Sequence, residues 1–139
     1  MQFYTPGNKS GSYGARESWI TALNNPGASQ LIYLKTLMLK YHFETLFPDQ
    51  SVLKEPGERY NHLVALRGKT CLLVYTYNGR PINLNVNQLS GTQFSYKWYC
   101  PRTGKVIKTG RFKKDEVREF NPPGLKGNGN DWVLILENI

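Results

Sequence analysis

The side chains best suited to contact a ligand are two tyrosines and two arginines, each near a predicted strand end. Tyr77 and Arg80 flank an Asn-Gly turn, and Tyr99 and Arg102 lie at a Pro-Arg-Thr-Gly corner. Aromatic rings offer flat faces to sugars or bases, and guanidinium groups can donate hydrogen bonds to hydroxyls. Packing within a sheet explains such tyrosines equally well, so binding and core packing both stay open for Tyr77 and Tyr99.

The sequence contains no recognisable catalytic or metal-binding set. His42 and His62 have no Cys, Asp or Glu at metal-ligand spacing, which favours solvated or core histidines. No Ser lies in a nucleophile elbow, and no Gly-rich loop opens a helix after a strand. The few acidic residues fall in capping or loop positions, and no two are spaced as an acid–base pair. We therefore expect no catalytic residue, cofactor or metal in this chain.

The clearest structural pattern is a hairpin over residues 93–112. Its first strand alternates polar residues with an apolar set that we expect on one face of a sheet, namely Phe94, Tyr96, Trp98 and Cys100. Pro101 can end this strand because it lacks an amide hydrogen, and Gly104 can adopt positive φ before the second strand.

Five further strands are predicted over residues 62–66, 70–77, 81–86, 117–120 and 131–137. The dipeptide Asn78-Gly79 is typical of a two-residue hairpin turn with both residues at positive φ. The strand over 131–137 carries apolar residues on both faces, as a buried strand does, and both Trp98 and Trp132 are expected in the core. Seven short strands at this spacing predict a mainly β fold, a small antiparallel β-sandwich with an N-terminal pair of helices.

The two helices are predicted over residues 15–23 and from Pro26 onward, and residues 44–61 are interpreted as a connector. The second helix carries an apolar stripe that we expect to contact a barrel or another partner, formed by Leu31, Leu34, Met38 and Tyr41. Further apolar residues at 32, 37, 39 and 43 widen this stripe beyond one face. Such a width predicts burial on more than one side, which one small sheet cannot provide.

The composition is that of an ordinary globular chain of 139 residues with a net charge of +8. Bases concentrate between Lys97 and Arg118, which can attract an anionic partner or can protect an exposed edge strand from pairing. Cys71 and Cys100 could form a disulfide or remain free thiols. No apolar run is long enough for a membrane span, and the N-terminal residues do not form a signal peptide.

Several ordered motifs resemble a known family. They are YTYNGRP, WYCPRTGK, PPG and DWVLILE, and they resemble the C-terminal β-sandwich module named as the collagen-binding domain of a collagenase. That module typically follows a (β/α)8 glycoside-hydrolase-like barrel in polysaccharide-degrading enzymes, many of them from Bacteroidetes. The stretches MQFYTPGN, ESWITALNNPGASQLIYLKTLM and LFPDQS resemble the end of such a barrel and its link to the sandwich.

The resemblance implies that residues 1–50 are a helical remnant of a barrel with its linker, and that residues 51–139 are the accessory sandwich. The chain would then be a truncated gene product or a piece of a larger glycoside hydrolase, with a periplasmic or extracellular location. The barrel strands that carry catalytic carboxylates are absent, so the resemblance places no catalytic residue here.

Three functions follow as hypotheses. The leading one is a non-catalytic module that stabilises the parent barrel and contacts polysaccharide. The second is direct binding of glycan or collagen through Tyr77, Arg80, Tyr99 and Arg102. The third, ranked lowest, is a basic single-strand nucleic-acid binder. A homodimer formed through the exposed helix is a further expectation.

Overall fold

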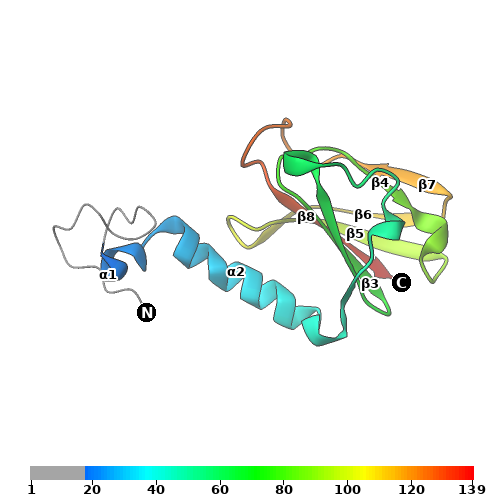
Figure 1. Cartoon of the computed structure of the whole chain (residues 1–139). Helices are drawn as coiled ribbons and strands as arrows, with labels where there is room; N and C mark the ends of the chain where they lie inside the picture. The colour runs from blue at the N-terminus through cyan, green and yellow to red at the C-terminus, as the bar shows by residue number, and fades with distance from the viewer. Residues whose placement is uncertain (1–17) are drawn as a thin grey trace.

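The computed structural model describes residues 18–139 and shows a β-sandwich with one long helix packed outside it (Figure 1). Helix α1 spans Trp19–Ala22, and helix α2 spans Pro26–Lys40 with Pro26 in its first turn. Proline is tolerated there because the first amide hydrogens of a helix have no partner within the helix. The loop expected over residues 1–14 and the helical position at 15 lie outside the described residues. Figure 1 shows α1 and the start of α2 projecting beyond the sandwich.

In the described part of the chain, eight strands form two antiparallel sheets, which confirms the mainly β class. The strands are β1 (Phe47–Pro48), β2 (Leu63–Arg67), β3 (Cys71–Thr76), β4 (Ile82–Asn85), β5 (Gln93–Cys100), β6 (Lys105–Lys113), β7 (Val117–Phe120) and β8 (Trp132–Asn138). The larger sheet has the order β1-β2-β3-β8-β5-β6, and β4 pairs with β7 in the smaller one. The basic strand β6 is therefore an edge strand, as the edge-protection interpretation requires.

The segment predicted as a connector is more ordered than its sequence indicates. It contains β1, which pairs with the end of β2, and the 3₁₀ helices Phe43–Thr45, Gln50–Val52 and Arg59–Asn61; a fourth follows β4 at Val86–Gln88. Elements of two or three residues are too short to show a hydrophobic period, so the pattern of prolines and turn residues concealed them.

The main core lies between the two sheets. The apolar set of β5 points into it, with Phe94, Trp98 and Cys100 buried and Tyr96 partly buried, as predicted. Trp98 meets Trp132 edge to face with ring centroids 6.5 Å apart, an arrangement that aromatic quadrupoles favour. Both tryptophans are thus core residues and do not face a ligand.

A second apolar layer lies on the outer face of the larger sheet. Leu37 of α2 and Tyr41, which caps the helix C-terminus, are buried there against Leu73, Val133 and Ile135. Strand β8 accordingly has apolar residues on both faces, because one face meets the main core and the other meets α2. The prediction of a two-sided strand over residues 131–137 is confirmed.

The hairpin turn predicted at Asn78-Gly79 is wrong in two respects. Gly79 has φ +66, but Asn78 does not adopt positive φ, and the strands on either side belong to different sheets. The chain therefore crosses between sheets here and does not form a hairpin. The buried Asn78 donates from Nδ2 to Asn61 Oδ1 at 2.9 Å, and its Oδ1 accepts from the Arg80 backbone N–H at 3.2 Å.

Candidate functional site

The crossover after β3 is held by Arg80, one of the four predicted ligand contacts. Its guanidinium donates to the carbonyl oxygens of Asn61 at 2.7 Å and of Glu55 at 3.0 Å. Little of this side chain is exposed, and the Glu55 carboxylate lies at 4.0 Å. Because its N–H groups donate to backbone oxygens, Arg80 connects two loops and presents few donors to solvent.

Tyr77 stands at the same end of the sandwich and has an aromatic neighbour. Its ring centroid lies 5.8 Å from that of Tyr60, and the two planes are inclined by 34°. Tyr60 is 70% exposed and Tyr77 is 36% exposed. No sequence pattern pointed to Tyr60, which lies in the predicted connector and follows Arg59, a residue at φ +50.

Arg102 belongs to a compact polar cluster at the Pro-Arg-Thr-Gly corner. Its guanidinium lies 3.4 Å from the Asp131 carboxylate, donates to the Gly129 carbonyl and sits 5.3 Å above the Trp132 ring. Burial and the neighbouring Asp131 raise the pKa of Tyr75 to about 12. Arg102 therefore fixes the loop before β8, and most of its donors already have partners.

Tyr99, the fourth predicted contact, is covered by α2. Only 8% of it is exposed, and its hydroxyl donates to the Tyr33 carbonyl at 3.1 Å. The face of β5 that was predicted to be polar is thus shielded from solvent at Tyr99, because helix α2 covers it. Of the four predicted contacts, only Tyr77 presents an exposed ring.

Helix α2 divides the predicted interface residues into two groups. Met38 and Tyr41 pack on the sheet, whereas Leu31 and Leu34 are exposed. Leu31 and Leu34 line a groove of about 400 Å³ between the N-terminal half of α2 and the sheet, opposite Tyr75 and Val133. One part of the wide apolar stripe of α2 is thus buried against the sheet of this chain, and another part is exposed.

A charged network anchors the C-terminal end of α2. Tyr41 donates to Glu137 Oε1 at 2.9 Å, and Lys97 donates to Glu137 Oε2. Burial alone would raise the pKa of Glu137, but the hydrogen bonds from Lys97 and Tyr41 outweigh it and hold that pKa below its usual value. Burial and the adjacent carboxylate together raise the pKa of Tyr41. Beside this network lies an open cleft of about 580 Å³ with Lys40, Lys69 and Arg111 on its lining.

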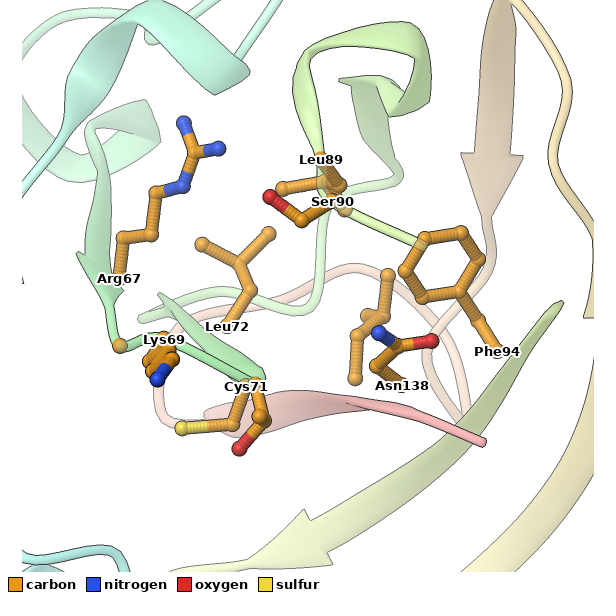
Figure 2. Close-up of a pocket in the computed structure, with 11 residues that line it drawn as sticks. Arg67, Lys69, Cys71, Leu72, Leu89, Ser90, Phe94 and Asn138 are labelled. Atoms are coloured by element: carbon orange, nitrogen blue, oxygen red, sulfur yellow. The ribbon is translucent and has the colours of Figure 1, made fainter. Parts of the chain in front are cut away.

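A smaller cavity lies at the edge of the main core, between strands of the larger sheet and the loop at residues 89–90. Figure 2 shows Leu72, Leu89 and Phe94 around it, together with the polar side chains of Arg67 and Asn138. Its volume of about 20 Å³ is close to that of a single water, so it cannot take a sugar ring.

The groups with reactive side chains are dispersed. Cys71 and Cys100 are free thiols. The exposed His42 contacts Glu44 at 3.3 Å, and the exposed His62 contacts the Gly57 carbonyl at 3.1 Å. Within residues 18–139, no group of three or more His, Cys, Asp or Glu side chains could hold a metal ion. No helix in this described part of the chain is long and apolar enough to cross a membrane.

Comparison with solved structures relates this fold to carbohydrate-active enzymes. A protein described as a glycoside hydrolase matches with a TM-score of 0.86 and 41% identity over 98% of this chain. A glycoside hydrolase family 5 protein from Bacteroides vulgatus ATCC 8482 matches with a TM-score of 0.87 and 40% identity over 99% of this chain. The present chain spans only 30% of the length of each of these two proteins. No curated protein matches it.

The sequence itself matches one family model over residues 47–137, from β1 to β8. This region contains the four motifs on which the resemblance rested, and it covers both sheets. The chain belongs to the family described as "Putative collagen-binding domain of a collagenase".

Proposed function

We propose that this chain is a non-catalytic C-terminal accessory module of a bacterial glycoside hydrolase, and that it packs on the (β/α)8 barrel of that enzyme and stabilises it. The observation that carries the proposal is the unsatisfied apolar surface of α2. Solved glycoside hydrolases that match this chain over nearly its whole length contain more than twice as much additional chain. That additional chain is a natural partner for such a surface.

The geometry of α2 supports this assignment. Successive residues of a helix are about 100° apart, so Ile32 and Leu39 point almost oppositely to Tyr41, which faces the sheet. Ile32 and Leu39 are both exposed, and Phe43 is exposed just beyond the helix. These three residues, the outer stripe of α2, would face water in an isolated module. Burial of large apolar residues of this kind contributes about 1.5–3 kcal/mol for each side chain.

The groove lined by Leu31 and Leu34 extends the proposed interface to a second surface. It is open and largely apolar, and it lies where α2 separates from the sheet. A loop or helix end of the barrel that entered it would bury these two leucines together with part of Tyr75. Met38 and Tyr41, which were expected at the interface, would instead position α2 by holding it on the sandwich.

Reading the coding DNA upstream of Met1 tests the assignment. We expect an in-frame (β/α)8 barrel, together with a secretion signal that would place the parent enzyme in the periplasm or outside the cell. A separate gene with its own promoter and secretion signal would contradict the proposal. In that case a homodimer through the outer stripe of α2 would be the alternative, and size-exclusion chromatography with light scattering would detect it.

Direct glycan or collagen binding by the sandwich is a second candidate function. The observation that favours it is the exposed ring of Tyr77 beside Tyr60. Within residues 18–139, the feature that favours a nucleic-acid partner is the basic edge strand β6, and protection against edge pairing explains it without a partner.

A further inference from the structure

Two neighbouring tyrosine rings at one end of the sandwich keep surface in contact with water, with Tyr60 70% exposed and Tyr77 36% exposed. Tyr60 and Tyr77 come from separate segments, the 3₁₀ helix Arg59–Asn61 and the residue after β3. Their centroids are 5.8 Å apart with planes inclined by 34°, so the two rings are direct neighbours in a tilted pair. Tyr60 is the more exposed of the two, and most of its surface is in contact with water. We call this pair the tyrosine platform.

The backbone beneath the platform is held rigidly. Arg80 bridges the carbonyl oxygens of Asn61 and Glu55, and the Asn78 amide donates to Asn61 Oδ1. Two of these hydrogen bonds connect the 3₁₀ helix that carries Tyr60 to the loop that follows Tyr77, and the third reaches Glu55 ahead of that helix. Arg59 adopts φ +50, a conformation that non-glycine residues adopt only where the surrounding structure requires it. A ligand would meet two rings that are already ordered, which lowers the entropic cost of binding.

The chemistry of the platform favours a neutral sugar. The axial C–H groups of a pyranose ring pack on the negative face of an aromatic ring, and adjacent rings can take successive residues of a chain. The mostly exposed Glu55 carboxylate beside Arg80 is a hydrogen-bond acceptor for sugar hydroxyls. In the larger sheet, β8 and β5 separate β3 from the basic strand β6, so the main cationic segment does not border the platform.

We propose that Tyr60 and Tyr77 form a stacking site for pyranose rings of a neutral polysaccharide. Arg80 and Asn78 are positioning residues for this site, and they do not touch the ligand. The choice of polysaccharide over collagen rests on the proposed glycoside-hydrolase parent. The site itself belongs to the sandwich and does not require the barrel, so its failure would leave the proposed packing of α2 unaffected.

Affinity gel electrophoresis of the 139-residue chain tests the site. Separate native gels would contain xylan, galactan, arabinan, mannan or mixed-linkage β-glucan, and an acidic gel would contain polygalacturonate. We expect retardation by at least one neutral polysaccharide, and its dissociation constant would then be measured by isothermal titration calorimetry. Absence of retardation in every neutral gel would overturn the proposal.

Substitutions locate the binding surface. Tyr60→Leu and Tyr77→Leu remove the aromatic face but keep apolar bulk, and each should weaken binding by about tenfold, equivalent to about 1.4 kcal/mol. Tyr60→Phe and Tyr77→Phe should retain most of the affinity, because stacking does not need the hydroxyl. Phe47→Leu, at an exposed aromatic residue on β1, is the matched control and should bind as the unmodified chain does. Circular dichroism would verify that each variant is folded.

Three results would contradict the site. The first is unchanged sugar affinity in the folded double Leu variant. The second is binding of a triple-helical collagen peptide with no binding of any glycan, because prolyl rings would then be the ligand. The third is binding of single-stranded oligonucleotides or polygalacturonate alone with steep salt dependence, which would indicate the basic strand instead.

Discussion

Tyr41 at the end of helix α2 donates a hydrogen bond to Glu137 Oε1 in the C-terminal strand β8, at 2.9 Å and across 96 positions of sequence. The same carboxylate pairs with Lys97 of β5. One acidic side chain therefore joins the helix to two strands of the larger sheet. This connection keeps the inner side of α2 on the sandwich and leaves its outer stripe directed away.

Removal of the Tyr41 hydroxyl should loosen this connection. Tyr41→Phe keeps the ring in the outer apolar layer but removes the donor to Glu137. We expect a loss of about 1.5 kcal/mol in the free energy of unfolding, at the lower end of the range for a hydrogen bond to a charged group. Urea denaturation followed by tryptophan fluorescence measures it. Tyr77→Phe, which alters an exposed tyrosine, is the control and should change stability by less than about 0.5 kcal/mol.

The contribution of Glu137 to the free energy of unfolding should also depend on pH. Its pKa in the folded chain lies below its ordinary value of 4.5. A carboxylate with a lowered pKa stabilises the fold fully above its unfolded pKa, and this contribution is lost as the pH falls through the folded value. Glu137→Gln should therefore reduce stability at pH 7, and the difference from the unmodified chain should shrink below about pH 4.5. Thermal unfolding at pH 7, 5, 4 and 3 tests the prediction; a constant difference would refute it.

The corner between β5 and β6 requires glycine for two reasons. Gly104 has φ +69, and a Cβ added there would lie 2.5 Å from the Tyr33 ring on α2. Gly104→Ala should cost at least about 1–2 kcal/mol, since left-handed backbone strain adds to the displacement of Tyr33. Gly127→Ala is the matched control, because a Cβ at that position meets nothing within 4 Å. Equal unfolding midpoints for the two variants in urea would contradict this account.

Arg80 should matter for stability because it binds backbone oxygens. Arg80→Ala leaves the carbonyl groups of Asn61 and Glu55 without their charged donor, and the expected loss is about 1–3 kcal/mol. Arg80→Lys should recover only part of it, since an ammonium group lacks the planar fork that reaches both carbonyls. Limited proteolysis should show faster cleavage between β3 and β4. Lys126→Ala, in an exposed loop, controls for the lost charge and should be neutral.

The sequence predicted those parts of the fold in which local pattern and tertiary environment agree. The period of two in β5 placed Phe94 and Trp98 in the core, and the two-sided pattern of β8 indicated a central strand. The crossover at Asn78-Gly79 was missed because the same dipeptide suits a hairpin, and only the pairing of β4 with β7 separates the two cases.

The candidate sites were less predictable because they depend on which distant segments meet. Tyr99 lies on the face expected to be polar, and α2 covers it. Arg80 and Arg102 were predicted to face a ligand, but nearby carbonyl and carboxylate oxygens take up most of their donors. Tyr60 becomes noticeable only once it lies beside Tyr77. The wide stripe of α2 predicted burial on a second surface, which stays a prediction, and the division of its residues between buried and exposed positions required the structure.

The most direct test of the central claim is the thermal stability of a chimeric enzyme. The chain would replace the matching 30% of the Bacteroides vulgatus glycoside hydrolase, which shares 40% identity with it. Differential scanning calorimetry would compare this chimera with one that carries Ile32→Glu and Leu39→Glu in the outer stripe, and with a Lys54→Glu and Lys126→Glu control at exposed lysines. We predict that barrel and module unfold in one transition. The outer-stripe substitutions should lower the midpoint temperature of this transition by several degrees, and the lysine substitutions should leave it unchanged. An unchanged transition in the outer-stripe variant would show that α2 does not hold the barrel.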